Sequence, residues 1–315
     1  MTRPSLIKIA ILIAKAALTG FLVWLIASRI NFTSALALIG TLDTVVLVQA
    51  GLIFLGGYAI GGYRLILVLR MFGRSCSFAK GFKINLSGLF LGQVLLTFIS
   101  GDAFRVWQLT KLDIDLRTAA TAIFLDRAMG SIGMIALAGL GLVPLLGIIE
   151  NPLMAWGSIL AVAAGITGVA IFFVLGVVVP DQLRTIRYLG AVVELASANR
   201  FAWLAPRQSA ATMAASLVIH LLIVLAVYVL ALGFGLDITY FQCFMVVPII
   251  MFLSMLPISL SGWGVREGMM IVAFELLGYP ADKALAIGIT LGLIMIAISL
   301  PGGLLWLQTR REGIK

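Results

Sequence analysis

The sequence of 315 residues is 62% hydrophobic and only 11% charged, and its formal net charge is +9. Its mean hydropathy is +1.16. These values exclude a soluble globular domain, because no such fold hides that much apolar surface from water. The longest polar stretch, Asp181–Gln208, is too short for a separate folded domain, so any binding or catalytic site has to be built inside the membrane.

The positive charges lie in groups beside apolar runs, a pattern typical of membrane topology rather than of nucleic-acid binding. The groups, which we place on the cytoplasmic side together with both termini, are Arg3/Lys8/Lys15, Arg64/Arg70/Arg74/Lys80/Lys83, Arg105/Lys111/Arg117, Arg184/Arg187/Arg200/Arg207 and Arg310/Arg311/Lys315. The connections near 31–43, 150–151, 237 and 282–283 hold few positive residues, and we expect them to face outward.

The first half of the chain predicts three crossings and one hairpin. Apolar runs long enough to cross a hydrocarbon core of about 30 Å occupy 6–27, 44–63 and 118–149. We interpret 6–27 as a retained helix rather than a signal peptide, because it lacks a small-residue cleavage site. The segment 84–116 lies between two cytoplasmic groups, so we expect it to enter the membrane and return as a hairpin.

The second half of the chain repeats this order. Apolar crossings are predicted at 156–179, 209–235 and 284–307. The segment 241–278 contains two apolar arms, yet it starts and ends at connections that we expect to face outward. It therefore forms a second hairpin that enters from the other side of the membrane.

The expected fold class is an all-α polytopic membrane protein that forms a single integral membrane domain over 1–315. It has about six membrane-crossing helices and two oppositely inserted re-entrant helical hairpins. The halves, about 1–150 and 151–315, form an inverted repeat, which is typical of transporters in which half-helices line a polar cavity. The alternative is that one or both hairpins are ordinary pairs of short helices, which would change the orientation of the final helix.

The first hairpin is predicted to turn at a short stretch of small residues, and charged residues follow this stretch in the sequence. Ser100 and Gly101 form the predicted tip, because glycine lets the backbone turn without a Cβ clash. Asp102 and Arg105 come next, and a spacing of three residues places them on one face of a helix.

The second hairpin has a similar break. Pro257 lacks the N–H that would continue a helix, and the predicted tip follows it. The tip residues are Ser261, Gly262 and Gly264. Arg266 and Glu267 come directly after them, so this break again carries an arginine beside a carboxylate.

A third charged pair, Asp126-Arg127, lies about nine residues into the apolar run that begins at Arg117, or roughly 14 Å along a helix. Charges at membrane depth cost roughly 3 kcal/mol or more each on insertion scales, so we expect them to be paired. The candidate substrate site contains Arg105, Arg127, Arg266, Asp102, Asp126 and Glu267. Arginine suits phosphate oxygens, which favours a lipid phosphate. The alternative is that all six residues form internal salt bridges.

The role of the carboxylates stays open. They either orient the arginines, contact an amine or hydroxyl of a headgroup, or carry a proton. His220 is interpreted either as a packing residue or as part of a proton relay with Asp102, Asp126 and Glu267. We expect no metal site and no cofactor, because neither metal-ligand spacing nor a nucleotide or Ser/His/Asp motif occurs.

These motifs resemble the flippase-like transmembrane region of lysylphosphatidylglycerol synthases and of stand-alone bacterial and archaeal membrane proteins. Three segments carry the resemblance, which covers nearly the whole chain: Gly92 with Ser100-Gly101-Asp102-Ala103-Phe104-Arg105, Leu125-Asp126-Arg127, and Pro257 with Gly262-Trp263-Gly264-Val265-Arg266-Glu267-Gly268. Asp102 stands where the family more often has glutamate. The resemblance implies movement of a lipid, in some members aminoacylated phosphatidylglycerol and in others hopanoid or isoprenoid-linked lipids.

We therefore predict a flippase-like lipid transporter in a bacterial inner membrane, which moves an anionic or phosphate-bearing lipid between leaflets, with proton coupling as an option. The synthases' soluble aminoacyl-transferase domain has no counterpart here, so we do not expect the chain to be an enzyme. The alternatives are an intramembrane enzyme that uses the same carboxylates as acid and base on a polyprenyl or phospholipid headgroup, and a non-catalytic assembly protein. The expected partner is a membrane lipid and not nucleic acid, and a homo-oligomer stays open.

Overall fold

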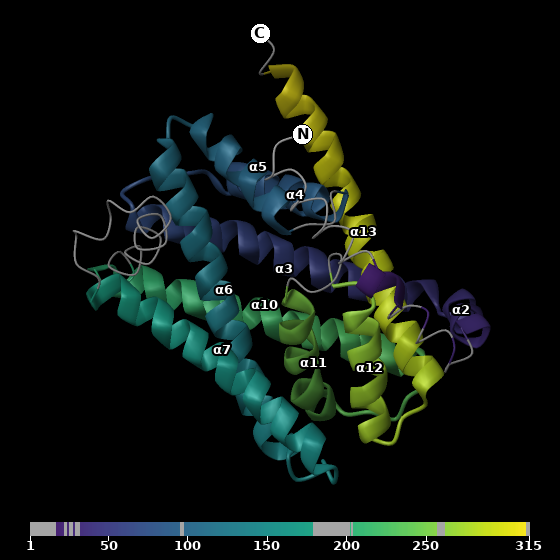
Figure 1. Cartoon of the computed structure of the whole chain (residues 1–315). Helices are drawn as coiled ribbons and strands as arrows, with labels where there is room; N and C mark the ends of the chain where they lie inside the picture. Colours follow the sequence, from purple (N-terminus) through teal and green to yellow (C-terminus); the bar gives the residue numbers. More distant parts are fainter. Residues whose placement is uncertain are drawn as a thin grey trace.

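The computed structural model describes residues 17–21, 24, 28, 32–94, 98–178, 202, 204–256 and 262–312, and every regular element within these ranges is helical (Figure 1). The helices are α2 (Phe32–Thr41), α3 (Thr44–Met71), α4 (Phe78–Val94), α5 (Phe98–Thr110), α6 (Leu116–Leu145), α7 (Pro152–Val178), α10 (Pro206–Gly233), α11 (Tyr240–Met255), α12 (Val265–Leu276) and α13 (Ala281–Glu312). The predicted all-α class is confirmed.

Five of the described helices are long and apolar enough to cross a membrane, which confirms a multi-pass membrane protein. Their spans are Thr44–Met71, Leu116–Leu145, Pro152–Ile171, Pro206–Gly233 and Ala281–Leu307. The sixth predicted crossing, 6–27, lies largely outside the described residues. The predicted end of the second crossing at residue 63 is wrong, because α3 continues to Met71 and carries Arg64 inside the helix. The predicted connection 31–43 also contains a helix, α2.

Helix α7 exposes most of its apolar side chains on the surface of the protein. Only 6% of an 18-residue apolar stretch of this helix is buried inside the protein. Leu153, Trp156 and Leu160 are strongly exposed along it. A helix satisfies its own backbone hydrogen bonds, so it can present such a face to lipid without leaving polar groups unpaired.

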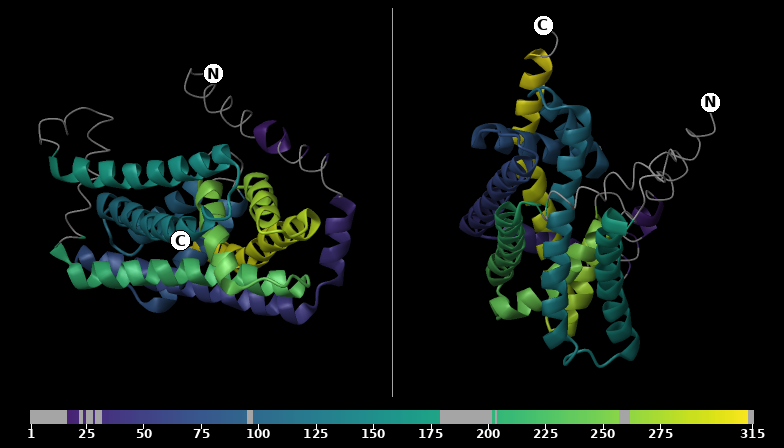
Figure 2. Two further views of the ribbon diagram at one scale, coloured as in Figure 1. Left: turned by 90° about the horizontal axis from the view of Figure 1, so that it is seen from below. Right: turned by 90° about the vertical axis from the view of Figure 1, so that its left-hand side faces the viewer.

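Helices α3 and α10 lie side by side along their lengths (Figure 2). Near the start of α3, Val46 packs against Gly233 at the end of α10. Towards the other end, Arg64 Nη1 donates a hydrogen bond to Ser216 Oγ at 3.1 Å. The two helices are therefore antiparallel, and the segments that follow them start from opposite faces of the protein.

Helices α4 and α5 form the first hairpin and return to the side from which they start. Arg74, just after α3, forms an ion pair with Asp115 at 3.8 Å. Asp115 caps α6, where its side chain accepts the backbone N–H of Thr118, and this bond lowers the pKa of its carboxyl. Because the residues before and after the hairpin are joined, the chain enters and leaves the membrane here at one face.

The first hairpin lies earlier in the chain than predicted. It begins at Phe78 and ends at Thr110, whereas the sequence placed it at 84–116. The difference arises because Lys80 and Lys83 lie inside α4, where both are exposed. Lysines at a helix end can extend their ammonium groups to the interface, so a positive residue does not have to end the apolar arm.

Helices α11 and α12 form the second hairpin at the other face. Lys283 Nζ donates to the carbonyl of Gly235 at 3.2 Å, and the Tyr279 hydroxyl donates to the carbonyl of Asp237 at 2.7 Å. The entry and exit of this hairpin therefore also lie together. With α3 and α10 antiparallel, two oppositely inserted hairpins are confirmed, while the symmetry of the halves 1–150 and 151–315 stays a prediction.

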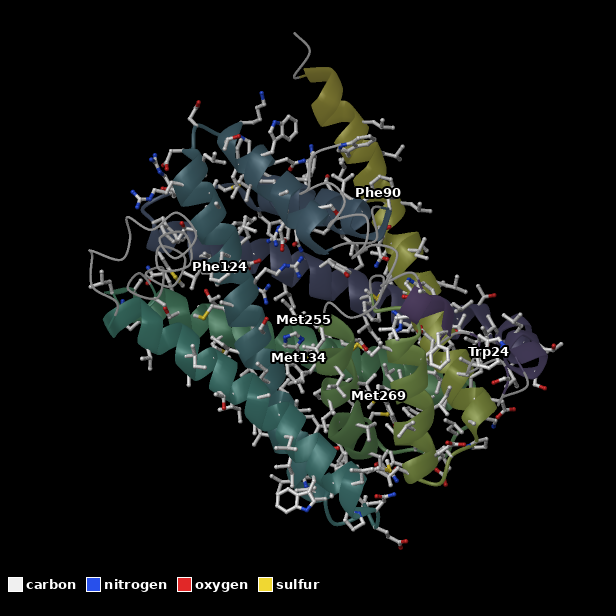
Figure 3. All side chains as sticks on the ribbon, in the orientation of Figure 1. Trp24, Phe90, Phe124, Met134, Met255 and Met269 are labelled. Atoms are coloured by element: carbon white, nitrogen blue, oxygen red, sulfur yellow. The ribbon has the colours of Figure 1, made fainter. Side chains whose placement is uncertain are left out.

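Helix α13 packs against both hairpins at different heights. In its first half, Gly288 lies 3.5 Å from Glu267 of α12, measured from the position a Cβ would take. In its second half, Gly303 lies against the ring of Phe90 in α4, which Figure 3 labels. The ring of Phe90 also lies 6.3 Å from the ring of Trp306. The final crossing thus holds the two hairpins at a fixed separation.

The predicted tip of the first hairpin is wrong in position, because Ser100 and Gly101 lie inside α5. Ser100 Oγ donates to the carbonyl of Leu91 at 3.2 Å. A Cβ on Gly101 would overlap the carbonyl oxygen of Gly88 in α4. These two residues therefore allow the arms of the hairpin to pack closely, which is the use of small residues in membrane helices. The connection at 95–97 lies outside the described residues.

The two glycines of the predicted tip of the second hairpin lie just before α12. Gly262 and Gly264 have φ values of +82° and +83°, a conformation that side chains other than that of glycine rarely adopt. Both glycines precede α12 directly. Pro257 and Ser261, which were assigned to the same turn, lie outside the described residues.

The packing of the first hairpin predicts that Gly101→Ala destabilises the protein. A methyl group at this position meets backbone atoms that cannot rotate away, so overpacking is expected to cost about 1–3 kcal/mol. Thermal unfolding in detergent measures the effect as a lower midpoint. Gly51→Ala in α3 is the matched control, because nothing lies within 4 Å of its Cβ position. Equal midpoints for the two variants would contradict the close contact.

Candidate functional site

An alternating row of charges joins three helices inside the protein. Arg64 of α3 donates from Nε to Asp126 of α6 at 2.8 Å, and Arg105 of α5 donates from Nη2 to the other oxygen of Asp126 at 2.7 Å. Arg105 Nη1 also donates to Asp102 at 3.2 Å, and Asp102 accepts from Arg127 Nε at 2.7 Å. Each of the two aspartates thus accepts hydrogen bonds from two arginines. We call these five residues the charge row.

The local structure explains how the charge row forms. Asp102 and Arg105 are three residues apart on α5, so they share one face of that helix. Gly88 of α4 gives the stem of Arg105 room, since a Cβ there would lie 2.6 Å from Arg105 Cγ. The side chain of Asp126 is 1% exposed and that of Arg105 4%, so their bond lies in a low-dielectric interior where an unpaired charge is costly.

A cavity of about 220 Å³ lies against the charge row. It is lined by residues of α3, α4, α5, α6 and α10, by Met255 of α11 and by Met295 of α13. Met255 lies near the centre of the molecule (Figure 3). Its polar lining residues are Tyr58, Arg64, Asn85, Gln93, Arg105, Arg127 and His220. Among the described residues, no carboxylate lines this cavity.

The cavity therefore presents arginines at its surface and keeps the aspartates behind them. Arg64, Arg105 and Arg127 bring three positive charges, whereas Asp102 and Asp126 bring two negative ones. The charge row as a whole carries one positive charge. Such a wall attracts an anion and repels a cation.

Two buried nitrogen atoms beside the cavity have no hydrogen-bond partner within the described part of the chain. One is Nε of Arg105, and the other is Nδ1 of His220. Both residues line the cavity. Each of these two atoms has less than 1 Å² of accessible surface, so other atoms of Arg105 and His220 form the cavity wall.

The second charged break lies apart from the charge row. Glu267 accepts from Nε of Arg266 at 3.0 Å, and its other oxygen accepts from the backbone N–H of Gly264 at 2.6 Å. The Arg266 guanidinium also lies over the Trp263 ring at 4.9 Å. Glu267 thus caps α12 and pairs Arg266 at the same time, and neither residue is among those that line the cavity.

Met295 stands between Arg266 and the cavity. Its sulfur lies 3.7 Å from Arg266 Nη1, and the same side chain lines the cavity. The six predicted site residues therefore separate into two groups. Arg105, Arg127, Asp102 and Asp126 belong to the charge row, whereas Arg266 and Glu267 form a local pair at the second hairpin.

Arg64 is the site residue that sequence reasoning missed. It was assigned to the cytoplasmic group with Arg70 and Arg74, because these residues follow one another closely. In the structure Arg64 lies seven residues before the end of α3 at Met71, and its side chain is 12% exposed. The apolar run Leu65–Leu69 that follows Arg64 indicates that this arginine lies within the membrane, where a charge needs a partner.

A family model described as the lysylphosphatidylglycerol synthase TM region matches residues 6–303. The match therefore includes the charge row, the cavity and both hairpins. None of the curated proteins matches the chain.

The charge row predicts that Asp126→Asn destabilises the protein strongly. The amide cannot balance Arg64 and Arg105, and removing one partner of a buried ion pair costs about 3–5 kcal/mol. The measurement is the thermal unfolding midpoint in detergent. Asp115→Asn is the control at the start of the same helix, because Asp115 is exposed and asparagine also caps helices. The role of Asp126 would be refuted by a variant as stable as this control.

Proposed function

The chain belongs to the lysylphosphatidylglycerol synthase transmembrane-region family, and we propose that it moves an anionic, phosphate-bearing lipid between leaflets. The headgroup enters the cavity beside the charge row, and the acyl or prenyl tails stay in the bilayer. The observation that carries the proposal is the composition of the cavity wall. Three arginines line one space within the membrane domain, and the carboxylates that pair with them are not among its lining residues.

The net charge of the charge row supports an anion with a single negative charge. Three arginines and two aspartates leave one positive charge uncompensated, and charge inside a membrane is stable only when it is paired. A phosphodiester headgroup carries one negative charge and completes the balance. Arginine binds phosphate with two parallel hydrogen bonds, which also fixes the orientation of the headgroup.

Size supports a small headgroup. One water molecule needs about 10–15 Å³ of cavity volume, so a cavity of about 220 Å³ has room for a phosphate with a compact substituent. Apolar residues complete the lining, among them Phe54, Leu89 and Ile223. An apolar wall around a few convergent polar groups is typical of a site that binds one small polar group.

We assign Asp102 and Asp126 a positioning role. Each accepts hydrogen bonds from two arginines, so proton uptake by either would weaken two ion pairs at once. Glu267 is occupied by Arg266 and by the N-terminus of α12. These contacts favour carboxylates that hold arginines over carboxylates that carry protons, and they favour a source of energy other than protonation of these groups.

The same contacts favour transport over the two alternatives. The enzyme alternative uses the carboxylates as acid and base, and no carboxylate lines the described cavity. A purely structural set of salt bridges needs no uncompensated arginine beside an open space. Binding and movement of an anionic headgroup accounts for both features.

The proposed location is the inner membrane of a bacterium, with the entrance of the first hairpin on the cytoplasmic side. Arg70, Arg74 and Lys80 lie around that entrance, and positively charged connections are retained in the cytoplasm. The second hairpin then opens towards the outer face of the membrane. The two hairpins meet the cavity region from opposite leaflets, an arrangement suited to alternating access.

Arg127→Ala tests the proposed function. Its side chain is 39% exposed and makes one ion pair, so its removal is expected to leave the fold intact. Reconstituted vesicles with tail-labelled fluorescent phosphatidylglycerol report movement as the fraction that dithionite bleaches over time. A hydrogen bond to a charged group contributes about 1.5–3 kcal/mol, so the rate should fall about tenfold or more.

Two controls sharpen this measurement. Arg127→Lys keeps the charge and should retain part of the rate, because lysine binds phosphate without the fork geometry. Arg74→Ala removes an arginine that lies outside the cavity and should move lipid as the native protein does. A folded Arg127→Ala protein with the native rate would show that the cavity is not the headgroup site.

A further inference from the structure

We infer that Asn85 of α4 recognises the uncharged part of the headgroup, because its side-chain oxygen is placed to accept a hydrogen bond from a hydroxyl beside the phosphate. The substrate is then a phosphodiester with a neutral substituent that carries a hydroxyl. The inference rests on the proposed function, since it describes the same cavity. It adds to the arginines, which bind the phosphate, a residue that distinguishes one substituent from another.

The spacing of the lining residues on α4 shows which side of this helix borders the cavity. Ile84 and Leu86, the neighbours of Asn85 in the chain, are buried and do not line the cavity. The residues that do line it recur at intervals of three, one, three and one, a pattern that places them on one face of a helix. They are Asn85, Gly88, Leu89, Gly92 and Gln93. The side chain of Asn85 therefore projects from the cavity face of α4.

The orientation of the Asn85 amide follows from its one hydrogen bond. Nδ2 donates to the backbone carbonyl of Tyr58 in α3 at 3.0 Å. A carbonyl oxygen only accepts hydrogen bonds, so the amide nitrogen lies on this side and Oδ1 on the other. A Cβ on Gly61 would lie 2.8 Å from the same nitrogen, so glycine leaves the amide its place against α3. Because a carboxamide does not titrate, Oδ1 is an acceptor at every physiological pH.

Oδ1 of Asn85 is both unpaired and accessible. No residue in the described part of the chain donates a hydrogen bond to it. Among the described residues, the buried side-chain atoms without a partner are Ser87 Oγ, Arg105 Nε and His220 Nδ1, and Oδ1 of Asn85 is not one of them. Asn85 is half-buried and lines the cavity, so its free oxygen is available to a ligand there.

Asn85 lies close to Arg105 along α4. The stem of Arg105 packs on Gly88, where a Cβ would lie 2.6 Å from Arg105 Cγ. Gly88 follows Asn85 by three residues, which correspond to roughly 4.5 Å of helix rise. A phosphate bound by Arg105 therefore has its substituent within reach of Asn85. A hydroxyl a few bonds from the phosphate, as in a glycerol-type headgroup, fits this separation.

The charges around the cavity select the kind of donor. No carboxylate of the described residues lines the cavity, and the charge row has one more arginine than aspartate. An ammonium group on the substituent would have no counterion there, and an unpaired charge in a low-dielectric interior is costly. A hydroxyl donates a hydrogen bond without carrying charge. An amide oxygen beside arginines thus favours a hydroxyl over an ammonium.

A purely structural role for Asn85 makes a different prediction. Polar side chains hold membrane helices together, and the bond from Asn85 to Tyr58 joins α4 to α3 in this way. If the amide serves only this bond, its loss slows all lipids equally or lowers stability alone. If Oδ1 binds a hydroxyl, its loss affects only lipids that carry one. The ratio of two transport rates separates these roles.

The experiment compares tail-labelled phosphatidylglycerol with tail-labelled phosphatidylmethanol, which has the same charge but no hydroxyl on its substituent. In reconstituted vesicles the native protein is expected to move phosphatidylglycerol about three- to tenfold faster, the effect of one hydrogen bond. Asn85→Leu has a side chain of similar size without the amide and should bring the ratio of the two rates close to one. Gln208→Leu is the matched control, because it removes an amide that does not line the cavity, and it should keep the native ratio.

Asn85→Asp gives a readout that a purely structural role would not move. A carboxylate still accepts hydrogen bonds, and it supplies the counterion that an ammonium lacks. The native protein is expected to move phosphatidylethanolamine more slowly than phosphatidylglycerol. Asn85→Asp should raise the rate of phosphatidylethanolamine relative to phosphatidylglycerol about tenfold, because hydrogen bonds between charged groups are the stronger ones. Each ratio is measured on one preparation, so a partial loss of folded protein does not change it.

Soluble glycerophosphoglycerol distinguishes a lipid from a free headgroup as the ligand. It has the same phosphodiester and hydroxyls without the tails. At a concentration equal to that of the labelled lipid, it should leave the lipid rate unchanged. Strong inhibition would identify the free headgroup as the ligand and overturn the assignment to a lipid.

The outcomes separate this inference from the proposed function. If Arg127→Ala loses both phospholipids while Asn85→Leu keeps the native ratio, the headgroup site stands and the role of Asn85 is wrong. If Asn85→Leu slows both lipids equally, or Asn85→Asp leaves the preference against phosphatidylethanolamine unchanged, the amide serves packing and the inference is also wrong. If Arg127→Ala retains both rates, the proposed function itself fails.

Discussion

A charge inside a membrane domain has to be paired, and the site is built around that requirement. Asp126 is almost completely buried and holds Arg64 and Arg105, while Asp102 links Arg105 to Arg127. These ion pairs connect α3, α5 and α6, so the pairing of the charges also holds the three helices together. The row contains one more arginine than aspartate, and the proposed anionic headgroup would balance this excess positive charge.

Glycine makes this arrangement sterically possible. Gly88 leaves space for the stem of Arg105, Gly101 lets α5 approach α4, and Gly130 lets Arg64 lie against α6. The re-entrant hairpins place these short, glycine-containing arms within the domain, where long crossing helices such as α3 and α13 cover them. In the second hairpin the charges are paired locally, because Glu267 caps its own helix and also pairs with the neighbouring Arg266.

Much of this fold follows from the sequence, because both apolar length and the distribution of positive charge are local properties. They predicted the crossings, the two opposite hairpins and the partnership of Asp102 and Asp126 with arginines. Predictions from these local properties were wrong where one residue type can serve either of two structural roles. Gly101 was assigned to a turn but serves close packing, and Arg64 was assigned to an interface but pairs with a residue 62 positions away. The separation of Arg266 and Glu267 from the cavity depends on the tertiary position of Met295, which no local pattern encodes.

The central claim is that an anionic headgroup completes the charge row. Its most direct test is an anomalous-difference map from crystals of the protein grown with a phosphodiester lipid in which selenium, as the marker, replaces one non-bridging oxygen of the phosphate. We expect marker density in the cavity within hydrogen-bond reach of Arg64, Arg105 and Arg127. Well-resolved arginines around a cavity without marker density, with the lipid bound elsewhere on the protein, would contradict it.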